Sequence, residues 1–467
     1  MTGIHAPQPA GPARGRRGPR GHTAAPPHGR EGCTAPARPA AVCELRLSAF
    51  RSLRARTVPL GPVTVLTGPS GSGKSTVLEA YRLLAGLACG ATVAETVAAT
   101  RGDVTALVPQ QARADAQGRR GFRLGCTVTG PAGPVRFDVA VQAEPELRVV
   151  GERLADPEGT LLSTALRDPG RRAVEATWRT SGRCRVLRAP FPDDRLTTPL
   201  LPLRVAGTNE AQRGVVTAAE QLVVALRSAF SCDPAPEAMR APAAAREGLL
   251  RSACDNLAAV LRRTGAECTA RHAALLSALR EGCTGPITQL RAESCGPGLV
   301  RAVLGRGAGR ADTPLEWLGD GELRYAALSL VLLTGPGVLA VDPVTEVPAA
   351  CRALMVLADG MDRDLDGRQA RRLLALASRM STRGRVRLLA TGPADGPLVR
   401  EATAAVAAVA PGAAAGESAS GAGGEAPSDA EAGAARGTPG EADGADTGPS
   451  GTGPAGIAGV SLVDLSA

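Results

Sequence analysis

A glycine-rich segment near the front of the chain constrains the fold more than any other feature. The apolar residues Val63, Val65 and Leu66 are typical of a short buried strand, and the sequence GPSGSGKS follows at once with the GxxxxGK[ST] spacing. Its glycines allow successive backbone N–H groups to point at a phosphate, while the positive end of the following helix lies behind them. The pattern therefore predicts a strand, a phosphate-binding loop and a helix in an α/β fold.

The residue types in this loop indicate ATP and Mg²⁺ as cofactors. Lys74 is expected to reach the β- and γ-phosphates, and the Ser75 hydroxyl is expected to coordinate Mg²⁺. Lys74 is also the only lysine among the 54 lysine and arginine residues. The chain thus has a compact ammonium group only in this loop, where a planar guanidinium would act differently. The loop residues expected to contact the nucleotide are Gly68, Pro69, Ser70, Gly71, Ser72, Gly73, Lys74, Ser75 and Thr76.

Composition separates a folded core from two low-complexity tails. Residues 1–41 are rich in Pro, Gly, Ala and Arg, and residues 412–467 are rich in Gly, Ala, Ser, Pro and Glu. We expect both tails to be disordered, because neither can bury enough apolar surface to offset the entropy of ordering. Of the formal net charge of +9, the tails contribute about +5 and −7, which leaves the core near +11. Removing both tails is therefore not expected to destabilise the core.

Other features of composition exclude several classes of protein. Aromatic residues make up 2% of the chain, which argues against a stacking platform for single-stranded nucleic acid. The 11 cysteines include no CxxC pair, so a zinc site is not indicated, and buried thiols in the reducing cytoplasm are expected. The longest apolar run, Ala326 to Leu333, is too short to span a membrane. The excess of arginine suits either a DNA surface or a solvated face.

Hydrophobic patterns divide the core into three parts. Alternating segments at Phe122–Thr129, Val135–Gln142 and Leu147–Leu154 predict an antiparallel β-meander inserted after the first helical region. A period near 3.6 residues later in the chain predicts helices of ordinary length. The predicted organisation is an N-terminal lobe with the meander at residues 42–216, a helical subdomain at 217–300 and a C-terminal lobe at 301–411.

Two later patterns suggest further parts of a nucleotide site. Leu318-Gly-Asp-Gly-Glu322 is a glycine-containing turn before an apolar helix, so it presents backbone N–H groups as an anion site does. Short apolar runs end at Asp342 and at Asp359, where an acid at the carboxyl end of a buried strand would face Mg²⁺.

Together these motifs resemble the RecF/SMC-like branch of the ABC-type P-loop ATPases, including bacterial AAA-family ATP-binding proteins. The resemblance covers about residues 42–391. It rests on Phe50-Arg-Ser-Leu, the phosphate loop, Val150-Gly-Glu-Arg-Leu, Asp255-Asn-Leu and the signature Leu318-Gly-Asp-Gly-Glu-Leu-Arg-Tyr. It implies a homodimer in the ATP state, in which the loop of one head and the signature of the other enclose each ATP. The signature residues so implied are Leu318, Gly319, Asp320, Gly321 and Glu322.

Three glycines depart from the pattern of that family. Gly319 stands where the signature usually has serine, Gly360 where the catalytic glutamate is expected, and Gly392 where a switch histidine is expected. Tandem glutamines at Gln110 and Gln111 are candidates for a nucleotide-sensing glutamine, although glutamines in a loop are more often only solvated.

Two assignments of the metal-facing acid remain open. Asp342 lies 24 residues after Leu318, the usual ABC separation, with Glu346 close behind it as a candidate base. Asp359 lies 32 residues before Thr391 and precedes a D-loop pattern at Asp366, and we favour it. The candidate catalytic residues are thus Asp359 and Glu346, and the candidate metal ligands are Ser75, Asp359 and Asp342.

Two functions fit the sequence. The resemblance implies an ATPase head whose ATP-dependent dimerisation drives a task linked to DNA or to another macromolecule. The missing glutamate and histidine favour a nucleotide-dependent switch or scaffold that hydrolyses ATP slowly or not at all. The sequence does not name the partner, and DNA and a partner protein both remain open.

Overall fold

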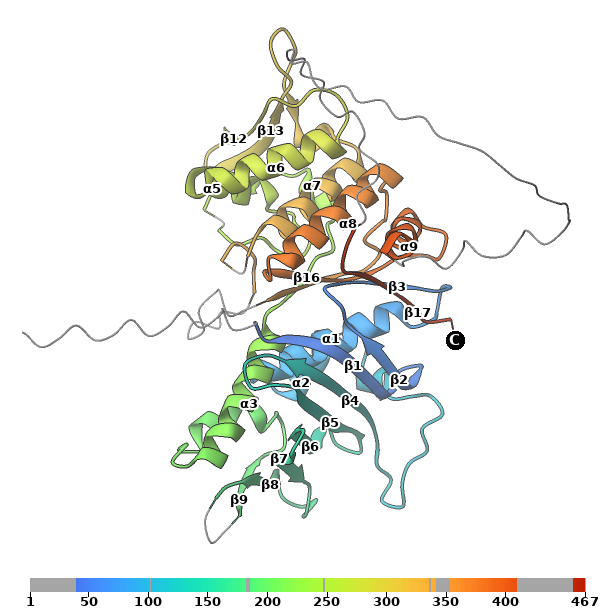
Figure 1. Cartoon of the computed structure of the whole chain (residues 1–467), viewed down its shortest axis with the longest axis vertical. Coiled ribbons are helices and arrows are strands. Elements are labelled where there is room, and N and C mark those ends of the chain that lie inside the picture. Colours follow the sequence, from blue (N-terminus) through green and yellow to red (C-terminus); the bar gives the residue numbers. More distant parts are fainter. Residues whose placement is uncertain are drawn as a thin grey trace, which may run out of the picture. The chain divides into compact units, whose positions relative to one another are not determined.

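Two large sheets and the helices packed on them form the part of the chain that the structure describes (Figure 1). The computed structural model describes residues 39–100, 102–181, 185–246, 248–335, 337–341, 353–409 and 457–466. The predictions for residues 1–38 and for 410–456, which form most of both tails, lie outside the described residues. The predicted α/β fold class is confirmed.

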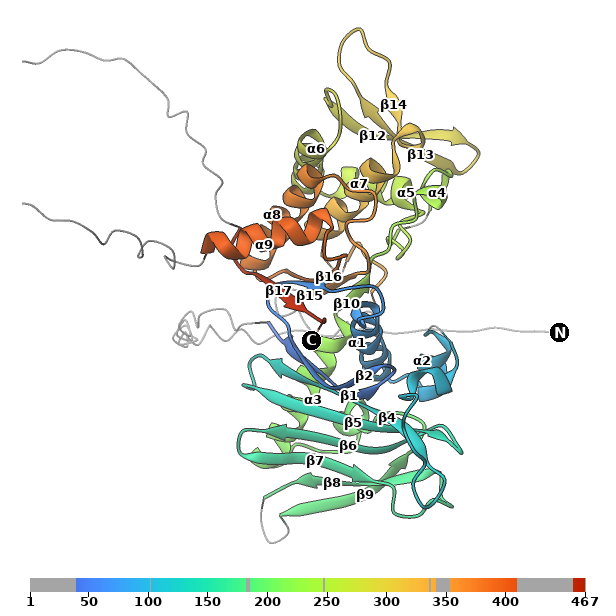
Figure 2. The ribbon, with the colours of Figure 1, turned by 90° about the vertical axis from the view of Figure 1, so that its right-hand side faces the viewer.

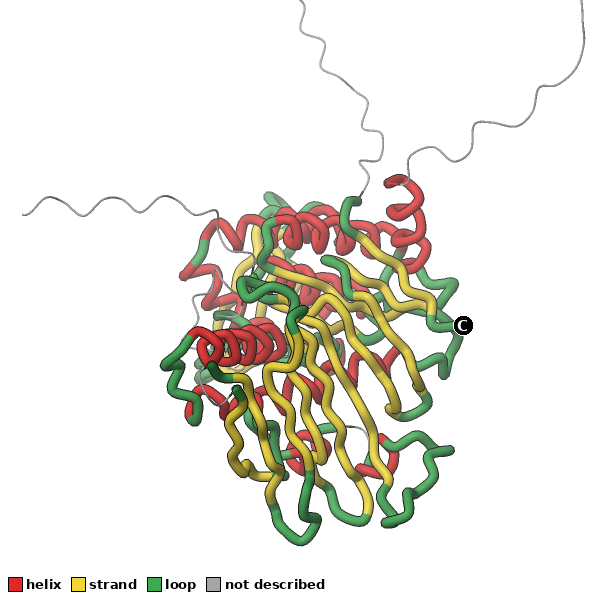
Figure 3. Tube along the Cα trace, turned by 60° about the horizontal axis from the view of Figure 1, so that its bottom comes forward, coloured by secondary structure: helices red, strands yellow, loops and turns green. Residues whose placement is uncertain are grey.

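An eight-stranded sheet has the order β2-β1-β4-β5-β6-β7-β8-β9, with antiparallel neighbours throughout. Its long strands lie side by side in the tube view (Figure 3). Alternation of buried and partly exposed residues, as in β8, places one face of each strand in the core. The strands are β1 (Ala41–Phe50), β2 (Leu53–Pro59), β4 (Arg120–Thr129), β5 (Val135–Glu144), β6 (Arg148–Asp156), β7 (Gly159–Ala165), β8 (Ala173–Arg179) and β9 (Val186–Pro192).

The β-meander is larger than the sequence pattern predicts. The three predicted segments correspond to β4, β5 and β6, and β7, β8 and β9 extend the same sheet. Strand β9 shows almost no alternation, because Phe191 is its only buried residue, whereas β8 alternates regularly and its pattern could have been recognised.

A five-stranded parallel sheet forms the centre, in the order β10-β15-β16-β3-β17. Every residue of β3 and of β15 is buried, as expected for strands covered on both faces. The strands are β3 (Val63–Thr67), β10 (Ala229–Ser231), β15 (Leu354–Ala358), β16 (Val386–Thr391) and β17 (Val460–Asp464). Because all strands are parallel, their carboxyl ends share one edge, where a ligand site is expected.

Helices cover both faces of the central sheet. Helix α1 (Lys74–Ala88) lies between the central sheet and the antiparallel sheet, whereas α7 (Asp320–Leu333), α8 (Gly367–Thr382) and α9 (Pro397–Val409) lie on the opposite side (Figure 2). Consecutive residues of β3 divide between the two layers: Val65 packs with the core of α7 and α8, and Leu66 with that of α1. The sheet therefore holds the start of α1 at its carboxyl edge.

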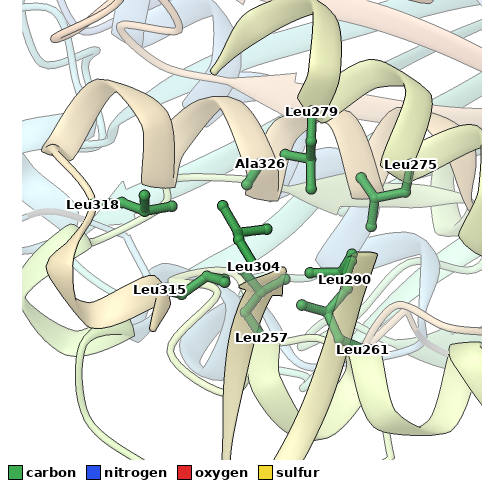
Figure 4. A pocket seen from close by; sticks show the side chains of 9 residues that line it. All are labelled: Leu257, Leu261, Leu275, Leu279, Leu290, Leu304, Leu315, Leu318 and Ala326. Atoms are coloured by element: carbon green, nitrogen blue, oxygen red, sulfur yellow. The ribbon is translucent and has the colours of Figure 1, made fainter. Parts of the chain in front are cut away.

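The region predicted as a helical subdomain at 217–300 is mixed. Its first helix, α3 (Glu210–Arg227), begins earlier and packs on the antiparallel sheet. In the rest of this region, helices pack on a β-hairpin, and a leucine-rich core lies between them (Figure 4). The further elements are α2 (Val93–Ala98), α4 (Pro236–Met239), α5 (Leu257–Glu267), α6 (Thr269–Gly282), β11 (Ala243–Ala244), β12 (Gln289–Gly296), β13 (Leu299–Gly305), β14 (Thr313–Pro314) and three short 3₁₀ helices, Val104–Leu107, Thr198–Leu203 and Leu315–Trp317.

The prediction of a disordered tail through residue 467 is wrong at its end. Val460 to Asp464 form strand β17, which pairs in parallel with β3. The next residue, Leu465, is buried, and its N–H donates to Thr67 O at 3.0 Å. The composition of the long segment before it, rich in Gly and Ala, conceals this short apolar strand.

Among the described residues, the structure contains no helix with the length and apolar character that a membrane span requires.

Candidate functional site

The predicted phosphate loop connects β3 to α1 with an unusual backbone. Gly68, Gly71 and Gly73 have φ values of 136°, 84° and 96°, in the region that favours glycine. A Cβ atom on Gly73 would also lie 2.7 Å from Leu53 Cδ2, so a larger residue does not fit there. The glycines are thus required by the path of the loop.

The start of α1 is left without the usual protein partners. Helices α2 and α8 each begin with a capping box, but α1 has neither a side-chain cap nor an acidic residue in its first turn. The hydroxyl of Ser72 in the loop is buried and has no hydrogen-bond partner among the described residues. An anion at this helix start would satisfy such donors. The loop therefore fits a phosphate group.

Lys74 folds back over the loop. Its Nζ donates to Gly68 O at 2.7 Å and to Pro69 O at 2.8 Å. Because these acceptors are neutral carbonyl groups, a phosphate oxygen would be a stronger partner for the ammonium group. Lys74 is thus held beside the loop and can exchange a weaker contact for a stronger one.

Asp359 meets Ser75 at the carboxyl edge of the central sheet. Strand β15 ends one residue before Asp359, and Ser75 Oγ donates to Asp359 Oδ1 at 3.0 Å. The hydroxyl of Thr391, at the end of the neighbouring strand β16, donates to the same oxygen at 2.7 Å. Ser75 is exposed and Asp359 is half-buried. The sheet thus brings the serine and the favoured acid within hydrogen-bond distance.

These two oxygen donors suit Mg²⁺, which takes oxygen ligands from one or two protein side chains and completes its shell with water and phosphate. The competing assignment, Asp342 with Glu346 as base, lies outside the described residues. Of the candidate metal ligands, the structure therefore describes Ser75 and Asp359 and brings them together.

Gly360 occupies the position that the resemblance gives to the catalytic glutamate. Its φ is 58°, in the left-handed region, and its N–H donates to Thr391 Oγ1 at 2.7 Å. A Cβ atom there would lie 3.1 Å from Arg363 Nη2. Any side chain at this position would therefore be strained.

Gly392, where a switch histidine is expected, faces a carboxyl group. A Cβ atom on Gly392 would lie 3.2 Å from Asp362 Oδ2 and 3.3 Å from Val399 Cγ2. Asp362 is buried, and this burial raises its pKa, while its Oδ2 accepts from Leu398 N at 3.4 Å. A larger residue than glycine would require these neighbours to shift.

The signature turn is held by residues from the region 217–300. Arg240 Nη2 donates to Leu318 O at 3.0 Å and to Asp320 Oδ1 at 2.6 Å, and Glu322 accepts from Thr284 N at 2.7 Å. The side chain of Leu318 points into the leucine-rich core (Figure 4). Among the described residues, no hydrogen bond joins Leu318–Glu322 to the phosphate loop. Within one chain, the two predicted halves of the site are thus separate.

The two glycines of the signature have different surroundings. Gly319 has an ordinary backbone, with φ of −63°, and a Cβ atom there would meet nothing within 4 Å. A Cβ atom on Gly321 would lie 2.2 Å from Asp364 O. Gly321 is therefore required for the close packing of the turn on the predicted D-loop, whereas Gly319 is not.

A pocket beside Ser75 and Asp359 contains residues that the sequence reasoning missed. It is also lined by Glu79 and Arg82 of α1 and by Thr100. Arg82 Nε donates to Ser231 Oγ at 2.8 Å, and Glu79 pairs with Arg51 at 2.7 Å. Glu79 and Arg82 lie four and seven positions after Ser75, so helical spacing alone would have placed them on its face.

The two glutamines proposed as nucleotide sensors are exposed residues of a turn. Their side chains make no hydrogen bond to any residue that the structure describes. Contact with solvent is enough to explain why polar side chains occur at Gln110 and Gln111.

The comparison with protein families matches residues 44–87 to the family model described as an AAA domain. This segment contains β3, the phosphate loop and nearly all of α1. Together with the parallel sheet and the loop geometry, this short match supports a P-loop nucleotide-binding fold. No curated protein matches the chain.

Solved structures of SMC heads are similar to this chain at low identity. One is an SmcHead bound to the C-winged helix domain of ScpA, at 14% identity and a TM-score of 0.39, covering 77% of this chain and 92% of that one. The SMC head domain from Thermotoga maritima is 14% identical with a TM-score of 0.37, and the match covers 77% of this chain and 91% of that one. A third structure is an Smc head domain with an extended coiled coil, bound to the C-terminal domain of ScpA derived from Pyrococcus furiosus. It is 12% identical with a TM-score of 0.39, and the match covers 78% of this chain and 92% of that one.

Proposed function

We propose that this chain is an ATPase head that binds ATP with Mg²⁺, dimerises when ATP is bound and hydrolyses it slowly. The observation that carries the binding step is the contact between Ser75 Oγ and Asp359 Oδ1 at 3.0 Å. A loop serine and a strand-end acid at this distance, beside Lys74, are the arrangement that P-loop ATPases use for a phosphate-bound Mg²⁺. Ser75 and Asp359 would hold the ion, which would neutralise charge on the phosphates.

Slow hydrolysis follows from the residue after Asp359. A glutamate there would orient or deprotonate the attacking water, a role that contributes roughly 10²–10⁴-fold in rate. Gly360 has no side chain, and its left-handed backbone disfavours one. The loop amides, Lys74 and Ser75 would contact phosphate already in the ground state, so affinity survives where turnover does not.

Dimerisation is supported by the separation of the phosphate loop from the signature. The start of α7 carries no side-chain cap, so its backbone N–H groups would face a second anion, although Asp320 and Glu322 in its first turn make this site less positive than the start of α1. The loop of one chain and the signature of another would then enclose one ATP between them. Since Gly319 lacks a hydroxyl, the sandwich would depend on backbone donors.

A comparison of three forms of the chain tests the binding step. Lys74→Ala should abolish ATP binding while leaving Tm unchanged, because the Nζ of Lys74 bonds, among the described residues, only to carbonyl groups of the loop. Lys74→Arg is the matched control that keeps the charge but not the compact ammonium group. Equal ATP affinity in wild type and Lys74→Ala, measured by calorimetry, would refute the proposal.

Turnover and mass distinguish a slow ATPase from a switch that does not hydrolyse ATP. We expect turnover well below the enzyme median of about 10 s⁻¹, and a doubled mass in light scattering when ATP is added. Turnover near that median would refute slow hydrolysis, and no detectable turnover would favour the switch. A strictly monomeric chain with ATP bound would refute dimerisation.

A further inference from the structure

A groove between α6, α7 and α8 lies outside the nucleotide site and carries unbalanced positive charge. Arg372 and Arg379 of α8, and Arg383 directly after the end of this helix, line it. Arg372 and Arg379 are seven positions apart, so they project from one face of the helix. We call this surface the α8 groove. Its other lining residues are Ala274, Ser277, Ala278, Glu281, Tyr325, Leu333, Leu376 and Met380.

Only part of this charge is neutralised within the described residues. Arg372 pairs with Glu281 at 3.3 Å. The guanidinium groups of Arg379 and Arg383 make no hydrogen bond or ion pair to any residue that the structure describes, and both residues are exposed. Apolar side chains such as Leu376 and Met380 lie between the arginines. The groove therefore suits an anionic chain that also carries small apolar groups.

The sequence contains such a chain between α9 and β17. Residues 412–456 include seven carboxylates, one arginine and many alanines. These residues lie outside the described ranges.

Both ends of that segment are attached at α8. Helix α9, which ends at Val409, is joined to α8 by the pair Arg371–Glu401 at 2.8 Å. After the segment, the chain returns beside α8, where Ser378 Oγ donates to Ala458 O. Ser378 directly precedes Arg379. An extended chain spans up to about 3.3–3.6 Å per residue, so the segment is long enough to cross the exposed face of α8.

We propose that the α8 groove binds the chain's own acidic segment, residues 412–456. A single exposed ion pair contributes less than about fivefold in affinity. Because the segment is joined to the described residues at both ends, its binding to the groove is intramolecular, so several weak pairs are enough. Occupation by this segment would exclude other polyanions from the groove.

A labelled peptide competing with the tethered segment tests the proposal in the full-length chain. The probe is a fluorescent synthetic peptide of residues 412–456. It should bind a chain whose own carboxylates are neutralised, and it should bind the wild-type chain at least about tenfold more weakly because the tethered segment competes. The neutralising substitutions are Glu417→Gln, Glu425→Gln, Asp429→Asn, Glu431→Gln, Glu441→Gln, Asp443→Asn and Asp446→Asn.

Two arginine variants of the neutralised chain separate the groove from general charge. Arg379→Ala with Arg383→Ala should weaken peptide binding by about tenfold. Arg123→Ala with Arg310→Ala removes the same charge from exposed positions outside the groove and should leave binding unchanged. Unchanged Tm in both variants confirms that each chain is folded.

Several outcomes would overturn the proposal. Equal peptide affinity in the two arginine variants would show a non-specific charge effect, and no binding to the neutralised chain would remove the site. If a DNA duplex binds the chain only when Arg379 and Arg383 are present, and the peptide does not bind, the groove would be a nucleic-acid surface. Dimers of the wild type without ATP, absent from the neutralised chain, would place the segment on a second copy.

Discussion

Thr391 Oγ1 donates a 2.7 Å hydrogen bond to Asp359 Oδ1 and accepts another of 2.7 Å from Gly360 N. One hydroxyl group thus fixes both the orientation of the metal-facing acid and the left-handed turn that follows it. The parallel register of β15 and β16, with Ala358 opposite Ala390, places these residues side by side. Under the proposed function, Thr391 is therefore a positioning residue for Asp359, the acid that would face Mg²⁺.

Replacement of this hydroxyl should weaken nucleotide binding only when Mg²⁺ is present. In Thr391→Val, Asp359 loses its orientation and Gly360 N loses its acceptor, so affinity for ATP with Mg²⁺ should fall about 2–10-fold, the effect of one hydrogen bond. Thr391→Ser, which keeps the hydroxyl, should restore it. Titrations with and without Mg²⁺ measure the difference. An equal loss under both conditions would indicate general damage to the fold.

Strand β17 should contribute to stability although it follows a long low-complexity segment. Leu465 is 4% exposed, so Leu465→Ala should lower the free energy of unfolding by about 2–4 kcal/mol. The exposed neighbour provides the control: Ser466→Ala should change it by less than about 0.5 kcal/mol. Denaturant titrations of the full chain provide both values. Equal stability of Leu465→Ala and wild type would show that the packing of the residue after β17 adds nothing to the stability of the fold.

This strand also reverses an expectation from composition. The sequence alone predicts that residues 42–411 are as stable as the whole chain, but this fragment lacks β17. The chain after β17 also approaches the phosphate loop, because a Cβ atom on Gly68 would lie 3.5 Å from Ser466 N. Removal of residues 457–467 should therefore lower Tm and weaken ATP binding together.

The signature tolerates the serine that the resemblance expects. Gly319→Ser introduces a hydroxyl where a Cβ atom meets nothing within 4 Å and the backbone is ordinary. It should strengthen the ATP-dependent dimer about 2–10-fold, as one added hydrogen bond would. Gly321→Ser is the contrasting variant, since its Cβ would clash with Asp364 O, and it should lower Tm. Sedimentation with ATP measures the dimer; no gain in Gly319→Ser would argue against the signature as a phosphate contact.

The parts predicted from sequence are those in which neighbouring residues carry the signal. The phosphate loop is one contiguous pattern, and Asp359 could be favoured because its separation from Thr391 reflects two adjacent strands. What escaped depends on contacts between distant segments: the contact of Thr64 in β3 with Ser461 in β17 joins residues 397 positions apart. Strand β9 has almost no buried face, and β17 is defined by its partner β3 more than by its own pattern.

The last prediction concerns restoring the missing carboxylate. In Gly360→Glu the new side chain would begin 3.1 Å from Arg363 Nη2, on a residue whose φ is 58°. The left-handed backbone should cost about 1–2 kcal/mol of stability, and Arg363 would attract the carboxylate away from a water at the phosphates. Turnover should therefore rise by less than about tenfold, far below the 10²–10⁴-fold of a well-placed base.

Two further variants separate the causes in this experiment. Gly360→Asn has a side chain that tolerates the left-handed region, so it should cost less stability than Gly360→Glu and leave turnover unchanged. Gly360→Glu combined with Arg363→Ala removes the competing cation and should give higher turnover than Gly360→Glu alone. Turnover per site and Tm are measured for each chain. A full 10²–10⁴-fold gain in Gly360→Glu alone would show that the turn adapts to a catalytic glutamate, and that slow hydrolysis reflects only the absence of its side chain.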